Sequence, residues 1–258
     1  MKINETIISD EHPTYFIAEI GSNFDGSLSR AIDLICLAKE CGANAVKFQH
    51  YTADTLVSDF GFSQLNNTSH QKKWKQSVSQ TYRDAELNYE WTQKLVEAAK
   101  ANNIDFFTSP YSFWLADYVE PYIPAYKIGS GDISWLEYLS YVSKKKKPIL
   151  LATGASSMVE VEKAVRTVSE NTKDLILMQC NTNYSADKTN SAFINLNVLK
   201  TFKEKYPWAV MGLSDHTQDN LSVLGAIAVG ARVVEKHFTD TPLSDAAPDH
   251  AFSVNPDQ

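Results

Sequence analysis

The sequence predicts a single α/β domain in which eight parallel strands and the helices between them close into a TIM barrel, a (β/α)8 fold. The length of 258 residues fits one such barrel, because this fold usually takes about 250 residues. Eight short, β-rich apolar runs recur along the chain, with helical patterns between them. The runs are almost continuously apolar rather than alternating, which is typical of strands buried on both faces of a parallel sheet.

The eight predicted strands leave room for a helix between each strand and the next. Strands that alternate with helices in this way close as a barrel more naturally than they remain an open sheet. The predicted strands are residues 15–21, 45–49, 105–109, 125–130, 148–154, 175–181, 209–215 and 233–239.

Three of the intervening helices are predicted from apolar residues that recur at steps of three and four. Gly42 supplies a left-handed stop after the first of them. Ser157 and Glu160 form a predicted capping box at the start of the second. Gly230 follows the third. The apolar faces are Leu28, Ala31, Ile32, Ile35 and Cys36, then Val161, Ala164, Val165 and Val168, and finally Leu221, Leu224, Gly225 and Ala228.

Three segments depart from the regular barrel pattern. Residues 1–14 precede the first strand, and we expect them to form a short hairpin that plugs the N-terminal end of the barrel. Residues 50–87 form a long polar insertion after the second strand, on the side where a lid would lie. The chain ends at Gln258, which leaves little room for a helix after the eighth strand. We therefore expect a C-terminal portion to be missing.

Composition excludes several classes of partner. The net charge is −7, whereas a nucleic-acid-binding surface needs a basic face to neutralise phosphates. The sequence has no signal peptide pattern and no run of about 20 apolar residues that could span a membrane. The three cysteines have no metal-site spacing. We therefore expect a cytoplasmic protein that binds small molecules.

Polar and charged residues stand at nearly every predicted strand end. In a parallel barrel the active site is built at the C-terminal ends of the strands, and burying charge there is costly unless the charge is paired or used. Two lysines, Lys47 and Lys127, and several hydroxyl groups at the C-terminal opening of the barrel, its mouth, predict an anion site, which suits a substrate that carries both phosphate and carboxylate. The polar and charged residues at the strand ends are Glu19, Lys47, Gln49, Thr108, Ser109, Lys127, Ser130, Asp132, Thr153, Asn181, Asn183, Tyr184, Ser214, Asp215, His216, Glu235, Lys236 and His237.

Two of these residues, His216 and His237, close consecutive strands, so their side chains can converge. Glu235 lies on the same side of its strand as His237 and could join them. Two imidazoles with oxygen ligands and open water positions suit a catalytic divalent ion such as manganese. The alternative for each histidine is a hydrogen-bonded position in the core.

Six motifs in this order resemble the sialic acid (N-acetylneuraminate) synthase family, and the likeness runs from about residue 15 to the end of the chain. The motifs are FIAEIG at 16–21, AVKFQ at 45–49, KIGS at 127–130, LSDH at 213–216, VEKHFT at 234–239 and PDH at 248–250.

The resemblance implies a reaction in which phosphoenolpyruvate condenses with N-acetylmannosamine or a related amino sugar aldehyde. The products are a nonulosonic (sialic-type) acid and phosphate. The resemblance also implies a divalent metal ion, Mn2+ or else Mg2+ or Co2+, and a homodimer in the full-length form. The implied catalytic residues are Glu19, Lys47, Lys127 and Asp132.

The resemblance further assigns binding roles. Phosphoenolpyruvate would be held by Lys47, Thr108, Lys127, Ser130, Asn183, Tyr184 and Ser214. The sugar would contact Glu19, Gln49, Tyr184 and Asp249. The metal would be bound by His216 and His237.

The chain also departs from the family pattern. Phe24 stands where the family usually has a histidine, and Asp132 stands where it usually has a glutamate. The resemblance implies a small antifreeze-like C-terminal domain that lends an arginine to the active site of the partner, and we expect this domain to be the missing C-terminal portion.

Three other functions remain open at this point. The first is an aldolase that forms a Schiff base between pyruvate and Lys127 or Lys236. The second is a sugar-acid synthase that acts on an aldose phosphate. The third is a barrel that binds phosphoenolpyruvate but is inactive without a C-terminal domain.

Overall fold

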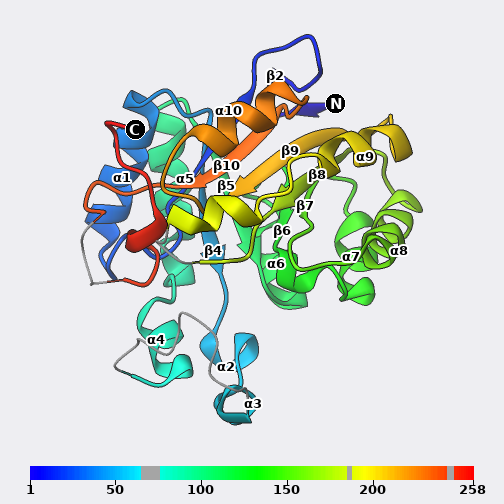
Figure 1. Cartoon of the computed structure of the whole chain (residues 1–258). Helices are drawn as coiled ribbons and strands as arrows, with labels where there is room; N and C mark the ends of the chain where they lie inside the picture. Colours follow the sequence, from blue (N-terminus) through cyan, green and yellow to red (C-terminus); the bar gives the residue numbers. More distant parts are fainter. Residues whose placement is uncertain (65–75, 185–187, 243–246) are drawn as a thin grey trace.

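The computed structural model describes residues 1–64, 76–184, 188–242 and 247–258. It contains the eight predicted parallel strands, arranged as a nearly closed barrel with helices outside (Figure 1). Their order in the sheet is β5-β4-β3-β10-β9-β8-β7-β6. The strands are β3 (Tyr15–Glu19), β4 (Ala45–His50), β5 (Asp105–Pro110), β6 (Tyr126–Ile128), β7 (Ile149–Ala152), β8 (Leu175–Cys180), β9 (Val210–Asp215) and β10 (Val233–His237).

The two strands at the ends of this order, β5 and β6, lie next to each other. In the described chain, however, ladder pairs are formed between β4 and β5 and between β6 and β7, but not between β5 and β6. The barrel therefore has one seam at which neighbouring strands are in contact but not hydrogen-bonded as a ladder.

The helices lie mainly outside the strands. They are α1 (Leu28–Glu40), α2 (Ala53–Leu56), α3 (Asp59–Gln64), α4 (Val78–Asp84), α5 (Thr92–Ala101), α6 (Phe113–Val119), α7 (Leu136–Ser143), α8 (Met158–Ser169), α9 (Val198–Lys205) and α10 (Leu221–Ala228). Short 3-10 turns are η2 (Tyr89–Trp91), η3 (Ser130–Asp132), η4 (Lys188–Phe193) and η5 (His250–Phe252).

The predicted helix ends are confirmed for α1 and α8. Gly42, just beyond α1, has φ +91°, a conformation that glycine adopts readily. The capping box at the start of α8 is complete, because the Ser157 side chain accepts a hydrogen bond from the Glu160 backbone N–H and the Glu160 side chain accepts one from the Ser157 backbone N–H.

The predicted apolar face of α10 is wrong. Leu221 and Leu224 are 74% and 62% exposed, and the helix instead buries Ser222, Val223 and Ala226. The physical reason is a hydrogen bond: Ser222 Oγ donates at 2.8 Å to Asp215 Oδ2, on the outer side of β9. This contact turns the side that carries Ser222 towards the sheet, which apolar spacing alone does not reveal.

Side chains that point into the barrel form an apolar core at its N-terminal half. The predicted plug is confirmed: a hairpin of β1 (Lys2–Ile3) and β2 (Thr6–Ile7) precedes the barrel, and Ile3 and Ile8 are buried against its interior. The interior residues of this cluster are Tyr15, Ile17, Ala45, Phe107, Ala125, Leu150, Ile176, Met178 and Val233.

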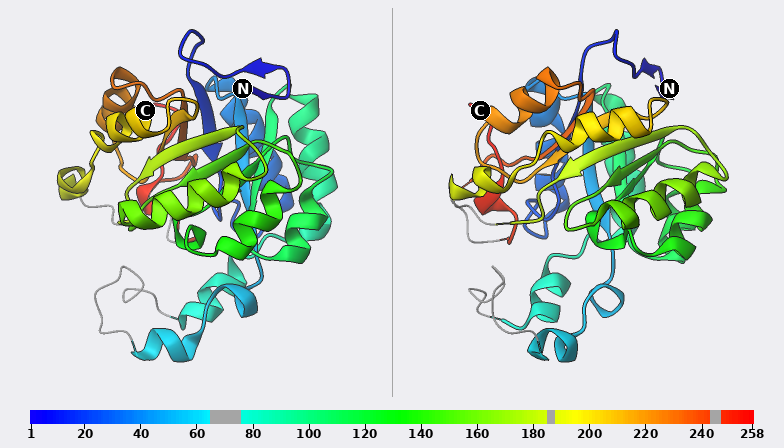
Figure 2. Two further views of the ribbon diagram at one scale, coloured as in Figure 1. Left: turned by 90° about the vertical axis from the view of Figure 1, so that its right-hand side faces the viewer. Right: turned by 45° about the vertical axis from the view of Figure 1, so that its right-hand side comes forward.

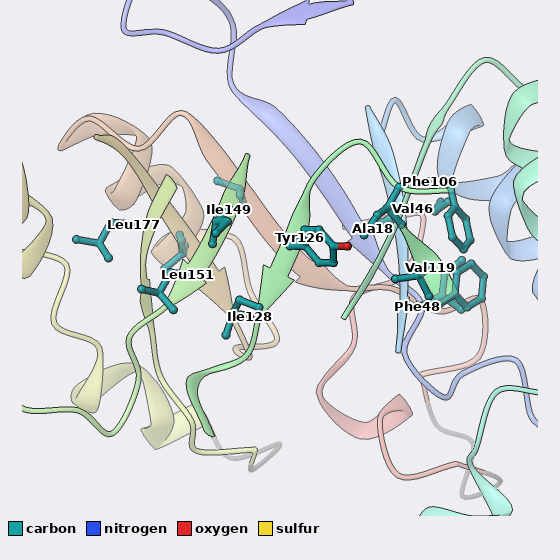
Figure 3. Close-up of a cluster of buried hydrophobic side chains, with 14 of the residues drawn as sticks. Ala18, Val46, Phe48, Phe106, Val119, Tyr126, Ile128, Ile149, Leu151 and Leu177 are labelled. Atoms are coloured by element: carbon teal, nitrogen blue, oxygen red, sulfur yellow. The ribbon is translucent and has the colours of Figure 1, made fainter. Parts of the chain in front are cut away.

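Side chains that point outward from the strands form the second and larger core, against the surrounding helices. Figure 3 shows part of it, with Ala18, Val46, Phe48, Phe106, Tyr126, Ile128, Ile149, Leu151 and Leu177 from the strands and Val119 from α6. Alternate residues of one strand therefore belong to different cores. The same alternation decides which strand-end residues can reach the mouth of the barrel.

The hairpin and the α2–α4 segment lie at opposite ends of the barrel in both views of Figure 2. The α2–α4 segment is part of the predicted insertion at 50–87, and residues 65–75 of that insertion lie outside the described residues. Its link to the barrel includes a hydrogen bond of 3.3 Å from Tyr51 Oη to the Tyr82 carbonyl oxygen. No helix in the described parts of the chain is long and apolar enough to cross a membrane.

Candidate active site

Two buried lysines and two buried carboxylates meet at the C-terminal ends of β3, β4, β6 and β10. Lys47 Nζ lies 2.7 Å from Glu19 Oε2 and 3.8 Å from Glu235 Oε1. Lys127 Nζ lies 3.2 Å from the same Glu235 oxygen. All four side chains are at most 5% exposed. The predicted convergence of Lys47 and Lys127 at one mouth therefore agrees with the geometry.

The charges in this cluster shift one another's pKa. Burial raises the pKa of Glu19 to about 7, although Lys47 opposes the shift and Glu235 adds to it. Burial acts against the charge on Lys47, but Glu19 and Glu235 outweigh it and raise the pKa of Lys47. Glu19 thus titrates near neutral pH while Lys47 remains a cation.

Asp132 lies in η3, just after β6, and is half-buried. Burial raises its pKa to about 6, with Lys127 opposing the shift. A carboxyl group with this pKa can accept and release a proton near neutral pH, which fits the predicted catalytic role of Asp132.

Hydroxyl groups surround the lysines, but the side chain of one predicted member, Thr108, lies outside this cluster. Thr108 points outward from β5, where its Oγ1 lies 2.7 Å from His50 Nδ1 and donates to the Phe48 carbonyl oxygen at 3.1 Å. Its neighbour Ser109 points inward, and Lys47 Nζ donates to Ser109 Oγ at 3.4 Å. Because alternate side chains face opposite sides of a strand, Ser109 and not Thr108 belongs to the mouth.

The other predicted phosphoenolpyruvate residues lie on two loops and one strand end. Ser214 Oγ donates to Glu235 Oε1 at 3.4 Å, within the lysine cluster. Ser130 Oγ accepts a hydrogen bond of 2.9 Å from the Gly154 backbone N–H, which joins the loops after β6 and β7. Asn183 is exposed, in the loop after β8. Tyr184, in the same loop, packs against His216 with ring centroids 4.3 Å apart and the ring planes tilted by 46°.

The predicted sugar contacts gather beside Glu19. Gln49 Nε2 donates to Glu19 Oε1 at 2.7 Å. Asp249 Oδ2 accepts a hydrogen bond of 3.0 Å from the Ser22 backbone N–H. Gly21 makes this approach possible, because it has φ +53° and a Cβ atom at this position would overlap the Asp249 carboxylate.

The two predicted metal-binding imidazoles are neighbours, with ring centroids 5.2 Å apart. His216 Nδ1 lies 2.6 Å from the Asn181 carbonyl oxygen. Since a carbonyl can only accept, Nδ1 carries a proton, and when the ring is neutral its Nε2 has the lone pair that can bind a cation. His237 Nδ1 is buried and has no hydrogen-bond partner within the described chain.

Charge around the imidazoles favours the neutral form of His237. Burial lowers its pKa well below the usual value, and His216 when it is protonated, together with Lys47 and Lys127, lowers it further. Asp249 Oδ2 lies 3.9 Å from His237 Nδ1. No group of three or more His, Cys, Asp or Glu side chains suited to a metal occurs among the described residues. A cation here would have the two imidazole nitrogens as protein ligands, and water or substrate oxygens would have to complete its shell.

Sequence reasoning missed Phe252, which packs against both imidazoles. Its ring centroid lies 4.8 Å from that of His237 and 6.0 Å from that of His216. Phe252 lies in η5, where a single apolar residue in a short irregular segment has no periodic pattern to mark it. Glu235 was also missed as the partner of both lysines; its inward position beside His237 was the available signal.

Phe24 stands where the sialic acid synthase family usually has a histidine, and its side chain does not reach the mouth. It is 1% exposed and packs in the outer core against Phe48 and Trp91. An imidazole nearby comes from His250, whose Nε2 lies 2.8 Å from Asp25 Oδ1. This departure therefore alters packing behind the loop rather than the surface that faces a substrate.

Comparison with known proteins adds to this geometry. Residues 34–258 match the model of the NeuB family. The chain is 34% identical to N,N'-diacetyllegionaminic acid synthase of Campylobacter jejuni, over 95% of this chain and 73% of that protein. It is also 34% identical to the spore coat polysaccharide biosynthesis protein SpsE of Bacillus subtilis, over 99% of this chain and 67% of that protein. The solved structure of a sialic acid synthetase from Leptospira borgpetersenii has a TM-score of 0.85 and 26% identity, covering 100% of this chain and 84% of that one.

Proposed function

Since the chain belongs to the NeuB family, we propose that it condenses phosphoenolpyruvate with an amino sugar aldehyde to give a nonulosonic acid and phosphate. Named relatives are synthases of N,N'-diacetyllegionaminic acid, pseudaminic acid and N-acetylneuraminate 9-phosphate. The observation that carries the proposal is the buried pair Lys47 and Lys127, joined through Glu235 at one mouth.

Phosphoenolpyruvate suits this mouth because it carries two anionic groups. Lys47 and Lys127 would receive its carboxylate and phosphate in charge-assisted hydrogen bonds, in exchange for their present contacts with Glu19 and Glu235. Ser109, Ser130 and Ser214 would add hydroxyl donors, and Asn183 and Tyr184 would close the site from the loop after β8.

The sugar would lie beside Glu19, Gln49 and Asp249, with Tyr184 on its other side. We propose N-acetylmannosamine or a related diacetamido sugar as the substrate. The identities to a legionaminic acid synthase, 34%, and to a pseudaminic acid synthase, 32%, support an amino sugar of this class.

His216 and His237 would hold a divalent cation, with Mn2+ favoured by two imidazoles and oxygen ligands, and Mg2+ or Co2+ as alternatives. A cation bound there supplies positive charge that polarises an aldehyde oxygen. The neutral form of His237 that its surroundings favour is the form that can bind a cation.

In the proposed reaction, carbon 3 of phosphoenolpyruvate forms a bond to the aldehyde carbon, and the aldehyde oxygen becomes a hydroxyl group. Glu19, with a pKa of about 7, can supply the proton for that hydroxyl. Water adds to the cationic carbon 2, and Asp132 can accept its proton. The bond between carbon 2 and the bridging oxygen then breaks, so that phosphate leaves and a ketone forms. Lys47 and Lys127 orient the reactants and balance the anionic charge.

The proposal is tested with phosphoenolpyruvate that carries oxygen-18 in the bridging position, together with Mn2+ and a panel of amino sugars. The expected result is that the label leaves with phosphate and that only one or two sugars support phosphate release. Label retained in the organic product would contradict the C–O cleavage step. Calorimetric binding of phosphoenolpyruvate without phosphate release from any sugar would favour the alternative of a binding barrel that needs a further domain.

The Schiff-base alternative now concerns Lys127 alone, because Lys236 points outward from β10 into an ion pair with Asp215. Borohydride treatment in the presence of pyruvate would trap an imine on Lys127 if that aldolase chemistry operated. The proposed condensation makes no imine, so no covalent adduct is expected.

Two expectations from the sequence remain proposals. We propose that the full-length form of the protein is a homodimer and that it acts in the cytoplasm. Light scattering coupled to size-exclusion chromatography tests the first, and cell fractionation tests the second.

A further inference from the structure

A buried ion pair lies directly behind the two imidazoles, on the outer side of the same strands. Lys236 Nζ is 2.5 Å from Asp215 Oδ2, and the two side chains are 10% and 1% exposed. Asp215 immediately precedes His216, and Lys236 immediately precedes His237. Because side chains alternate along a strand, the ion pair points outward where the imidazoles point inward. The proposed chemistry does not use it.

Lys236 holds the chain on both sides of His216. Its ammonium group donates to Asp215 Oδ2 at 2.5 Å and to the Thr217 carbonyl oxygen at 2.6 Å. These acceptors belong to the residues directly before and directly after His216. The residue next to one imidazole therefore fixes the backbone around the other.

The Asp215 carboxylate is fully occupied by neighbouring donors. Oδ1 accepts from the Thr217 backbone N–H at 3.2 Å. Oδ2 accepts from Thr217 Oγ1 at 2.9 Å and from Ser222 Oγ, in the first turn of α10, at 2.8 Å. The pair is thus built into the fold, and neither side chain is available to a substrate.

His237 is paired with Glu19 of β3, but backbone pairing between β9 and β10 does not extend to the two histidines. The ladder between β9 and β10 begins at Val233 and Gly212 and ends at Lys236 and Asp215, so the histidines lie one residue beyond it. The preceding outward pair in the same ladder, Val234 and Leu213, is apolar and buried. A buried ion pair stabilises a fold no better than a well-packed apolar pair of similar size. Stability therefore does not explain why the last outward pair is ionic.

We propose that the Lys236–Asp215 pair is a positioning device that sets the spacing of His216 and His237, so that both imidazoles can bind one divalent cation. This inference rests on the cation site of the proposed function and is independent of the sugar. Removing groups that orient metal-binding histidines typically weakens metal binding about 10–100-fold, and an effect of that size is expected here.

The test compares Lys236→Met with Leu213→Ala, a control on the same two strands and the same outward face, one outward pair further from the histidines. The dissociation constant of Mn2+ is measured by calorimetry without substrates, and the midpoint of urea unfolding is measured in parallel. We expect Lys236→Met to raise the dissociation constant about 10–100-fold, while Leu213→Ala lowers the unfolding midpoint and leaves Mn2+ binding within about twofold of the wild type. Wild-type affinity in Lys236→Met would overturn the proposal. So would a loss of affinity in both variants that follows their loss of stability.

A double variant guards against simple unfolding of Lys236→Met. Asp215→Leu with Lys236→Met replaces the ion pair by an apolar pair and removes the hydrogen bond to the Thr217 carbonyl. We expect the double variant to fold and its affinity for Mn2+ to stay as low as that of Lys236→Met. Recovery of wild-type affinity in the double variant would show that the ion pair is not needed for spacing.

A metal-free measurement separates this proposal from the proposed function. The 1H–15N signals of the His216 and His237 rings are recorded without metal in the wild type and in both single variants. We expect them to shift or split in Lys236→Met but not in Leu213→Ala; unchanged signals would overturn the positioning role. If wild-type protein bound no divalent cation, the assignment of a cation to His216 and His237 would be wrong. The ring signals would still test whether the ion pair positions the two imidazoles.

Discussion

The two ends of the barrel are built from opposite kinds of side chain, although the same eight strands form both. At the N-terminal end, Ile3 and Ile8 close the interior with apolar contacts. At the C-terminal end, Lys47, Lys127 and Glu235 are buried almost as deeply but carry charge. Apolar burial stabilises the fold, whereas burying charge opposes it unless the groups are paired. Stability and chemistry are therefore separated along the barrel axis, as is usual for this architecture.

The largest expected effect is loss of activity at the charged end. Lys127→Met removes the cation that pairs with Glu235 at 3.2 Å and would bind an anionic group of phosphoenolpyruvate. We expect kcat/KM for phosphate release to fall about 1,000-fold, or about 4 kcal/mol of transition-state stabilisation. A fall of less than about tenfold would mean that Lys127 is not part of the anion site.

The apolar end should show the reverse behaviour. Ile3→Ala removes a fully buried side chain from the plug, and the resulting cavity is expected to cost about 2–4 kcal/mol of unfolding free energy. Urea unfolding measures this loss. At a temperature where the variant is folded, kcat/KM should match the wild type. Weaker phosphoenolpyruvate binding in Ile3→Ala would show that the two ends are coupled.

The pH dependence of activity tests the chemistry of the charged end more finely. The pKa of Asp132 is about 6, above its usual value because of burial. As a proton acceptor Asp132 must be ionised, so on the acidic side activity is expected to fall about tenfold for each unit of pH below about 6. Asp132→Asn should lower kcat at every pH and remove this acidic limb. An acidic limb that persists in Asp132→Asn would assign the titration to another group.

The smallest effects should distinguish the two sides of a single strand. Ser109→Ala removes an inward hydroxyl near Lys47, and we expect phosphoenolpyruvate binding to weaken by about 1 kcal/mol with little change in stability. Thr108→Val removes an outward hydroxyl that meets His50, and we expect a loss of about 1–2 kcal/mol in stability with unchanged binding. Calorimetry measures binding and urea unfolding measures stability in both variants. Weaker phosphoenolpyruvate binding in Thr108→Val but not in Ser109→Ala would contradict this assignment of the two side chains.

The fold could be predicted well because its signal is repeated. Each strand is a short apolar run, and all eight lie within one or two residues of the predicted bounds. The capping box at Ser157 and the stop at Gly42 depend on local chemistry, so they are visible in sequence. The plug could be predicted as a hairpin because the chain before Tyr15 has no room for another element of the barrel.

The site could be predicted only as far as strand ends mark it. Thr108 and Ser109 are adjacent polar residues, and only the register of β5 against its neighbours decides which of them faces the mouth. The buried face of α10 depends on a hydrogen bond between Ser222 and Asp215, which apolar spacing cannot reveal. Phe252 lies in a segment without periodicity, and its role arises from tertiary contact with the two imidazoles.

The seam between β5 and β6 has a consequence for local opening. Among the described residues, β6 forms ladder bonds with β7 alone, over the three pairs Tyr126↔Ile149, Lys127↔Leu150 and Ile128↔Leu151, whereas β8 is bonded on both sides. Amide protons of β6 should therefore exchange with deuterated water faster than those of β8, because fewer bonds must break to release them. The strand that carries Lys127 is thus the one that can separate from its neighbours most easily, and substrate bound to Lys127 should slow that exchange.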